Sequence, residues 1–364
     1  MRSLAFTLSA LFVISTTAIG EPFHPRDYPK KYAECDAVHR GGVAHAITKI
    51  EIEYVEVNPS GKRTLVLVHG WPSLWSSWSN QIQEFGKDYH LIVPNLRGFG
   101  ASTHPGDVES SGTMHDIVDD LVCIMDKVGV AEAVCVGHDW GADVCWSAAL
   151  QKPTRFTAVA ALVLPYIPAA GDFMPVEDIA KVLKKLTYQI FFEKRTPDAI
   201  KELDTDIRRT LRATLRTVDS PPPDAYLTSP GDFLGAYDGV DIPPIPFFTE
   251  EEEDYFIEQY SIQGFQHTLQ FYTHGNRHGS HEHSKNFDPT ISQPALVILP
   301  TQDPVADWNL LSQILGSAEH VPKMATVEVD AAHWPQLEKP AEVNKALREW
   351  LDELDKAEAV RDEL

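Results

Sequence analysis

The chain has 364 residues, 43% of them hydrophobic, with 53 Asp and Glu residues against 31 Lys and Arg residues and a formal net charge of -22. An apolar fraction of this size over this length can bury a substantial core, which excludes a disordered or low-complexity protein. The negative charge repels phosphate and no basic stripe offsets it, which argues against nucleic acid as a partner. An acidic enzyme that acts on a neutral small molecule fits this composition.

The first 20 residues are typical of a secretory signal peptide. Arg2 supplies the positive start, residues 4–14 form the apolar run, and Ala18-Ile19-Gly20 places small residues before an expected cleavage at Glu21. The alternative is a membrane anchor, but Ser and Thr residues interrupt the segment and make it a poor spanning helix.

The last four residues, Arg361-Asp362-Glu363-Leu364, resemble the signal that the retrieval receptor of the endoplasmic reticulum reads. The alternative is a charged helix end that stops at a leucine by accident. Together with a signal peptide, this tail predicts the lumen of the endoplasmic reticulum, with secretion as the second choice. The oligomeric state stays open, a dimer included.

Four cysteines occur, Cys35, Cys123, Cys135 and Cys145, and an even number permits disulfides in an oxidising compartment. The last three lie in apolar runs typical of helix, strand and helix. A buried free thiol packs there as a small hydrophobe. We therefore expect thiols in the core and no essential bridge.

Strand-like and helical patterns alternate along both ends of the chain. Short β-branched runs occupy residues 50–57, 64–68, 91–93 and 133–136, with a helical pattern at about 114–128. Strand-like runs return at 295–299 and 325–329, before an amphipathic helix at about 340–357. This alternation predicts an α/β fold, a mostly parallel sheet covered by helices on both faces.

The segment 166–287 has a different texture and interrupts that alternation. Apolar residues recur at helical spacing within 176–192, proline-rich stretches follow at 221–223 and 243–246, and Thr249-Glu250-Glu251-Glu252 forms a capping box that opens another helix. We interpret 166–287 as a helical cap inserted in one catalytic domain, which comprises residues 21–165 and 288–360.

Histidines accumulate near the end of this insertion, which raises the alternative of a metal site. Their spacing matches no single helical face, and Gly275 and Gly279 favour a loop, so we expect a solvated linker and no metal. The histidines are His267, His274, His278, His281 and His283.

Gly137-His138-Asp139-Trp140-Gly141 directly follows the run 133–136 and precedes a helical stretch at 142–150. Glycines two before and two after a central residue permit the tight strand-to-helix turn of a nucleophile elbow, usually centred on serine. A carboxylate that attacked a carbonyl would form an unstable anhydride, whereas attack on a saturated carbon gives an alkyl ester. Asp139 therefore predicts a substrate such as an epoxide or a haloalkane; the alternative is a simple helix cap.

An alkyl ester needs a general base that activates water. His333 follows the last strand-like run, where a sheet of this type delivers a loop histidine beside the elbow. Asp303, just past 295–299, is the expected acid that orients it; the alternative is a plain Asp-Pro turn. The chain order of nucleophile, acid and histidine matches that of α/β-hydrolases.

His69-Gly70-Trp71-Pro72 ends the strand-like run 64–68. Backbone N–H groups there, with that of Trp140, are candidates to stabilise the oxyanion that forms when water attacks the ester. The alternative is a turn without a catalytic role.

Four motifs together resemble the α/β-hydrolase-fold epoxide hydrolases, over about residues 43–352. The resemblance implies an eight-stranded sheet with an inserted cap, hydrolysis of an epoxide to a vicinal diol, and no metal or organic cofactor. The motifs are His69-Gly70-Trp71-Pro72, Asn95-Leu96-Arg97-Gly98-Phe99-Gly100-Ala101-Ser102, Gly137-His138-Asp139-Trp140-Gly141-Ala142 and Ala332-His333-Trp334.

The resemblance also implies two cap tyrosines that hold and protonate the epoxide oxygen. Segments 186–192 and 269–272 are similar to those that carry them, which points to Tyr188 and Tyr272. Glu193 to Pro197 replaces the Pro-Gly that often follows the first segment, and on a straight helix Tyr188 lies off the apolar stripe. Tyr188 can reach the cleft only if the helix breaks or turns a second face toward the cleft. The alternative is that both tyrosine rings only fill the cap and have no catalytic role.

Two other functions remain open. A haloalkane or haloacid dehalogenase shares the aspartate nucleophile and needs donors for a halide, which the indoles of Trp71 and Trp140 would supply. A non-catalytic lumenal protein with this fold is the other alternative. The small-molecule substrate itself, and whether it belongs to detoxification or to secondary metabolism, is not set by the sequence.

Overall fold

The structure, a computed structural model, describes residues 22–41 and 45–362. The expected signal peptide and the last two residues of the retrieval-like tail lie outside these ranges. Within them, no helix is both long enough and apolar enough to cross a membrane.

The predicted sheet is present and has eight strands in the order β1-β2-β4-β3-β5-β6-β7-β8. β2 pairs antiparallel with β1 and with β4, and all later pairs are parallel, so the prediction of a mostly parallel sheet is confirmed. The strands are β1 (Lys30–His39), β2 (Ala46–Val57), β3 (Thr64–Val68), β4 (His90–Pro94), β5 (Ala133–His138), β6 (Phe156–Leu162), β7 (Ala295–Pro300) and β8 (Met324–Val329).

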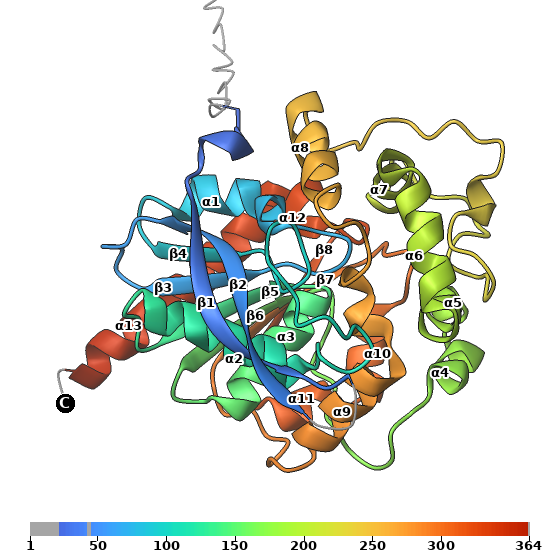
Figure 1. Cartoon of the computed structure of the whole chain (residues 1–364). Coiled ribbons are helices and arrows are strands. Elements are labelled where there is room, and N and C mark those ends of the chain that lie inside the picture. Colours follow the sequence, from blue (N-terminus) through green and yellow to red (C-terminus); the bar gives the residue numbers. More distant parts are fainter. Residues whose placement is uncertain (1–21, 42–44, 363–364) are drawn as a thin grey trace, which may run out of the picture.

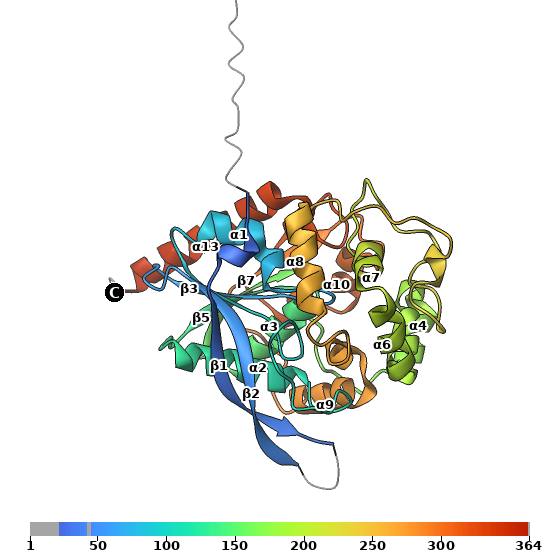
Figure 2. The same ribbon diagram turned by 45° about the horizontal axis from the view of Figure 1, so that its top comes forward.

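Each central strand sends alternate side chains into two separate cores. In β3, Leu65 and Leu67 belong to the core under α1 (Ser79–Phe85) and α13 (Pro340–Asp362). Val66 and Val68 belong to the core under α2 (Met114–Lys127) and α3 (Trp140–Gln151). This period of two explains why the parallel strands are apolar throughout, since both faces are covered. Figures 1 and 2 show the helices on the two faces.

The segment between β6 and β7 contributes helices but no strand to the sheet. In both views α4, α6 and α7 lie together at one side of the sheet (Figures 1 and 2). Its helices are α4 (Val176–Val182), α5 (Tyr188–Lys194), α6 (Thr196–Thr205), α7 (Ile207–Thr214), α8 (Glu250–Tyr260) and α9 (His274–Ser284). After β7 follow α10 (Trp308–Ile314), α11 (Ser317–His320) and α12 (Pro335–Glu338). The predicted capping box at Thr249 is present at the start of α8.

The apolar pattern over 176–192 does not form one helix. The chain leaves the helix after Val182, which is 79% exposed, and resumes at Tyr188, the first residue of α5. The Tyr188 N–H donates to the carbonyl of Leu227 at 3.1 Å instead of to the carbonyl one turn before it. This break turns Tyr188 inward, as its suggested role requires.

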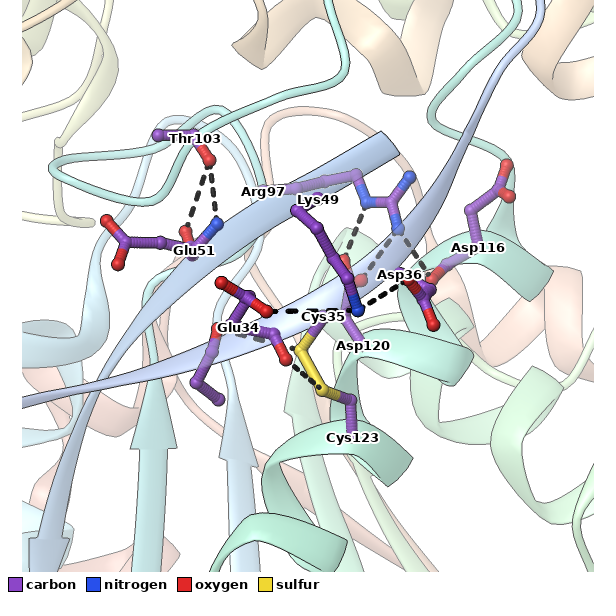
Figure 3. Close-up of a disulfide and its surroundings, with 11 residues drawn as sticks. Glu34, Cys35, Asp36, Lys49, Glu51, Arg97, Thr103, Asp116, Asp120 and Cys123 are labelled. Carbon is purple, nitrogen blue, oxygen red and sulfur yellow. Dashed lines mark hydrogen bonds and ion pairs between the residues drawn. A yellow bond between two sulfur atoms is a disulfide. The ribbon is translucent and has the colours of Figure 1, made fainter. Parts of the chain in front are cut away.

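The expectation of free core thiols is wrong, because all four cysteines are paired. Cys35 of β1 bonds to Cys123 of α2, the helix that covers the inner face of β1 (Figure 3). Cys135 of β5 bonds to Cys145 of α3. The apolar runs do place these residues inside, but the partners meet only when strand and helix pack together.

The expected histidine linker is also wrong, since residues 274–284 form α9. Gly275 does not loosen the chain but lets it come close to a neighbour: a Cβ there would lie 2.4 Å from the carbonyl oxygen of Glu109. Within the described residues, no group of three or more His, Cys, Asp or Glu side chains is arranged to hold a metal ion.

The loop that carries Asn95 to Ser102 is fixed by a buried ion pair. Arg97 Nε donates to Asp120 Oδ2 of α2 at 2.6 Å, and both side chains are almost fully buried (Figure 3). Arg97 also donates to the backbone carbonyls of Ser111 and Asp116. This part of the motif therefore supports the fold beneath the site.

Candidate active site

Asp139 stands at the turn between β5 and α3 with a positive φ of 54°. The two glycines of its motif are required by close approach. A Cβ on Gly137 would lie 2.1 Å from the carbonyl oxygen of Gly141, and a Cβ on Gly141 would lie 2.1 Å from that of Val68. Close approach within the turn therefore requires Gly137, and the neighbouring strand β3 requires Gly141; the resulting elbow lifts the carboxylate above the ends of the strands.

The two oxygens of Asp139 have different partners. Oδ1 accepts a hydrogen bond from the backbone N–H of Trp71 at 2.9 Å, and Oδ2 lies 3.4 Å from Nε2 of His333. Burial on its own raises the pKa of this carboxyl, but the hydrogen bond and charge of His333 outweigh burial and lower the pKa. Asp139 is thus held as a carboxylate.

His333 lies in the loop after β8, and Asp303 lies in the loop after β7. Asp303 Oδ2 is 2.7 Å from His333 Nδ1 and also accepts from the Trp308 indole N–H at 2.7 Å. Asp303 Oδ1 accepts from the backbone N–H of Val305 at 2.8 Å. The carboxylate therefore makes both the predicted contact with His333 and the turn contact of its Asp-Pro motif.

The two carboxylates set the charge of His333. Burial favours the neutral ring, but the charge of Asp303 and the hydrogen bonds to Asp139 and Asp303 raise the pKa of His333 to about 10. With Asp139 ionised, His333 is therefore protonated at neutral pH.

His138, beside the nucleophile, was not singled out in the sequence. Its Nε2 donates to the backbone carbonyl of His333 at 2.8 Å. Burial lowers the pKa of His138 to about 4, so the ring is neutral and acts as a fixed donor. It ties the histidine loop to the elbow, and only its place in the motif could have pointed to it.

The His69 to Pro72 turn has one residue that touches the nucleophile and one that holds the turn. Trp71 makes the contact with Asp139 and precedes Pro72 through a cis peptide bond. His69 is fully buried; its Nδ1 donates to the carbonyl of Gly70 at 2.8 Å, and its Nε2 accepts from the N–H of Leu96. Burial lowers the pKa of His69 to about 4, which keeps this bracing ring neutral.

Trp140 opens α3 and lies over the nucleophile with its indole stacked on Phe271 at 5.4 Å between ring centroids. Among the described residues, the N–H of Trp71 is the one backbone donor seen at the Asp139 carboxylate. The part expected of the Trp140 N–H therefore stays a prediction.

Tyr188 and Tyr272 come from separate elements and meet at the site. Their rings are 5.9 Å apart between centroids with an interplanar angle of 65°. The ring of Tyr272 also contacts those of Trp71 and Trp140 at 5.4 Å. Both tyrosines are at least nine-tenths buried. Burial raises the pKa of each phenol, so both keep their protons across the physiological range.

These groups share one cavity of about 710 Å³, a size common for small-molecule sites. Asp139, His333, Trp71, Trp140 and both tyrosines line it. Four further charged residues in its wall, Asp143, Asp172, Arg216 and Arg277, were not predicted. The cavity therefore brings together the predicted nucleophile, base and two phenols, with Asp303 behind the base.

Comparisons with known proteins agree with this geometry. A family described as the alpha/beta hydrolase fold matches residues 63–340. The chain is 33% identical to Epoxide hydrolase A of Mycobacterium tuberculosis over 319 residues, which cover 84% of this chain and 95% of that protein. It is 30% identical to Bifunctional epoxide hydrolase 2 of Rattus norvegicus, of whose length it spans 53%.

Solved structures give the same picture. The crystal structure of Epoxide Hydrolase A from Mycobacterium thermoresistibile matches with a TM-score of 0.72 and 30% identity, over 88% of this chain and 98% of that one. An epoxide hydrolase from an endophytic Streptomyces matches with a TM-score of 0.73 and 26% identity, over 90% of this chain and 96% of that one.

Proposed function

Because the chain belongs to the epoxide hydrolases of the α/β-hydrolase fold, we propose that it converts an epoxide to a vicinal diol through a covalent ester on Asp139. One observation carries the proposal: a buried carboxylate on an elbow faces a histidine–aspartate pair, and two protonated phenols share its cavity. A carboxylate nucleophile suits a saturated carbon, and the phenols suit an oxygen leaving group.

In the first step Oδ2 of Asp139 attacks a ring carbon. A carbon–oxygen bond of the epoxide breaks, an ester bond to Oδ2 forms, and Tyr188 or Tyr272 donates a proton to the released oxygen. Oδ1 keeps its hydrogen bond to the Trp71 N–H and becomes the ester carbonyl oxygen.

In the second step water attacks the ester carbonyl carbon. His333 takes a proton from the water, and the negative charge that develops on Oδ1 is stabilised by the Trp71 N–H. The bond between the carbonyl carbon and the alkyl oxygen breaks, and the leaving oxygen takes the second proton of the attacking water. The diol leaves, and the Asp139 carboxylate is restored beside protonated His333.

Ester formation itself prepares His333 for this second step. One of the two charges that raise the pKa of His333 belongs to Asp139, and the ester has no charge. The pKa of His333 therefore falls once the ester forms, so the histidine gives up its proton and can act as a base. That proton replaces the one that Tyr188 or Tyr272 gave to the epoxide oxygen. Asp303 remains to orient the ring.

A single turnover in water enriched in oxygen-18 tests the route. If the ester forms, mass analysis finds the label in the peptide that contains Asp139, because water attacks the carbonyl carbon. A labelled diol with an unlabelled Asp139 would mean direct attack by water and would overturn the ester mechanism.

A dehalogenase has less support. It needs indole N–H groups free to hold a halide, and the Trp71 indole N–H donates to Thr268 Oγ1 at 3.1 Å. Comparing diol release from an epoxide with halide release from the matched haloalkane decides between them. A non-catalytic role would require that Asp139→Asn leaves the cellular role of the protein unchanged.

We also propose the lumen of the endoplasmic reticulum as the compartment. Two disulfides support an oxidising environment, because cytosolic reductants keep thiols reduced. Imaging the full chain beside a variant with residues 361–364 replaced by alanine tests this, since loss of a retrieval signal sends the protein to the medium. Cytosolic staining of the full chain would contradict it.

A further inference from the structure

One wall of the cavity carries polar side chains that the proposed reaction does not use. Asp143 and Ser147 lie four residues apart on one face of α3, and Asp139 stands four residues before Asp143, directly before the helix. All three line the cavity. The stripe therefore leads away from the nucleophile in steps of one helical turn, about 5.4 Å each.

Asp143 is the group in this stripe without a protein partner of its own. Among the described residues, none is seen to donate a hydrogen bond to its carboxylate. Burial and the charge of Asp139 raise the pKa of Asp143 to about 6, and Arg277 opposes that shift. Asp143 is half-buried and lines the cavity, so its carboxylate is open to a ligand there that donates a hydrogen bond.

The facing wall belongs to α9, which contacts α3. Its polar residues are mostly engaged with protein: Asn276 donates to Val108 and Gln270 carbonyls, and Ser280 donates to the carbonyl of Asn276. Arg277 Nη1 donates to the almost fully buried Glu193 at 3.2 Å, so its charge is already balanced. Within the described part of the chain, Asp143 is the carboxylate of α3 that faces the cavity without a protein donor.

Most of the remaining lining is apolar, with residues such as Leu164, Ile167, Leu186 and Phe233. A substrate that fills the cavity thus meets apolar surface on most sides and the Asp143 carboxylate about one helical turn from Asp139. This pattern fits a largely apolar epoxide that carries a single polar group.

We propose that Asp143, continued by Ser147, forms a specificity site for a hydrogen-bond-donating group, a hydroxyl or an amine, carried by the epoxide about one helical turn from the reacting ring. The inference rests on the proposed function and names the substrate class of the same cavity. Asp143 binds the substrate and takes no part in the bond changes at Asp139.

The test uses four terminal epoxides of equal length that end in hydroxyl, amine, methyl or carboxylate, about four bonds from the ring to match the 5.4 Å of one turn. A hydrogen bond to a charged group corresponds to about tenfold in kcat/KM. The wild-type protein is expected to favour the hydroxyl and amine compounds over the methyl compound by about this factor, and to reject the carboxylate.

Asp143→Leu is expected to bring these ratios toward one. Asp143→Asn keeps an acceptor without the charge, so this variant is expected to retain part of the hydroxyl preference and to lose the amine preference. It also tests the proposal if Asp143→Leu does not fold. Asp119→Asn, an exposed aspartate of α2 paired with Lys152, is the matched control and keeps the wild-type ratios.

Ratios near one in the wild type, or ratios that Asp143→Leu and Asp143→Asn leave unchanged, would overturn the proposal. A preference for the carboxylate compound would also overturn the proposal, because it would mean that Arg277 binds the polar group of the substrate. If no epoxide is hydrolysed, the proposed function fails, and calorimetric titration of the four matching diols then tests the site alone. Tighter binding of the hydroxyl and amine diols supports it, and equal dissociation constants overturn it.

Discussion

The active site is built from two regions that hold their residues in different ways. Asp139, Asp303 and His333 stand just beyond three strands of the sheet and are fixed by charge-assisted hydrogen bonds. Tyr188 and Tyr272 stand on short helical segments between β6 and β7, and perpendicular ring contacts set their positions. The charged groups of the proposed reaction are therefore held by the sheet, while the positions of the phenols depend on packing of the cap.

The largest effect is expected from the nucleophile. Asp139→Ala removes the group that forms the ester, and turnover of an epoxide falls at least about 10⁴-fold. Initial-rate measurements of diol formation check this. Asp119→Ala, on an exposed site of α2, serves as the control with wild-type rates. Residual activity within tenfold of the wild type would show that the sheet side does not carry the reaction.

Replacing His333, the proposed general base, should separate ring opening from hydrolysis of the ester. His333→Gln leaves Asp139 able to open the ring but slows hydrolysis of the ester by about 10²–10⁴-fold, the range for general base catalysis. Mass analysis after mixing with an epoxide then finds a stable adduct on Asp139. His24→Gln, an exposed surface histidine, forms no lasting adduct. If His333→Gln forms none either, the histidine is not the base of the second step.

The cap tyrosines should give graded losses instead of a complete one. Tyr188→Phe and Tyr272→Phe each keep the ring contacts but remove a donor, and each slows ring opening by about 10–10²-fold, the double variant by more. Single-turnover rates of ester formation measure this. Tyr237→Phe is the matched control, because its hydroxyl donates to the carbonyl of Ala213 within the cap. If one single variant is as inactive as Asp139→Ala, the expected difference between the sheet residues and the cap tyrosines is wrong.

Both disulfides lie outside the cap, so their removal tests the rigidity of the sheet side. Replacing Cys35 and Cys123 by alanine is expected to lower the free energy of unfolding by about 2–4 kcal/mol. The Cys135 and Cys145 pair closes a much shorter loop and lowers it less, but Asp139 lies inside that loop, so ester formation slows as well. Urea unfolding and single-turnover rates separate the two effects. Equal rates in both double variants would show that the elbow holds without its bridge.

The last prediction concerns the pH dependence of stability. The pKa of His333 is about 10 in the folded protein and about 6.5 in the unfolded chain. Its ion pairs therefore stabilise the fold fully below about pH 6.5, and this contribution is lost as the pH rises toward 10. The difference in unfolding free energy between the wild type and His333→Gln should shrink over this range. A constant difference would contradict the protonated state of His333.

The sequence predicted the fold class well because apolar strands and amphipathic helices alternate along the chain. It did not reveal β1 or β6 as strands. In β1 the small residues Ala33, Cys35 and Ala37 mark the buried face, and β6 is a short Ala-rich run that periodicity alone cannot tell from a buried helix.

The sequence by itself determined the turn at Asp139, because the clash that requires Gly137 arises with Gly141, four residues on; the clash at Gly141 is with Val68 of β3 and belongs to the tertiary structure. The sequence also set the chain order of the nucleophile, acid and histidine. Only the tertiary structure decided the disulfide partners, the break before Tyr188 and the place of Asp143 in the cavity wall. Each of these depends on contacts between elements far apart in the chain, and the pattern of residues along the chain does not show which helices and strands pack against one another.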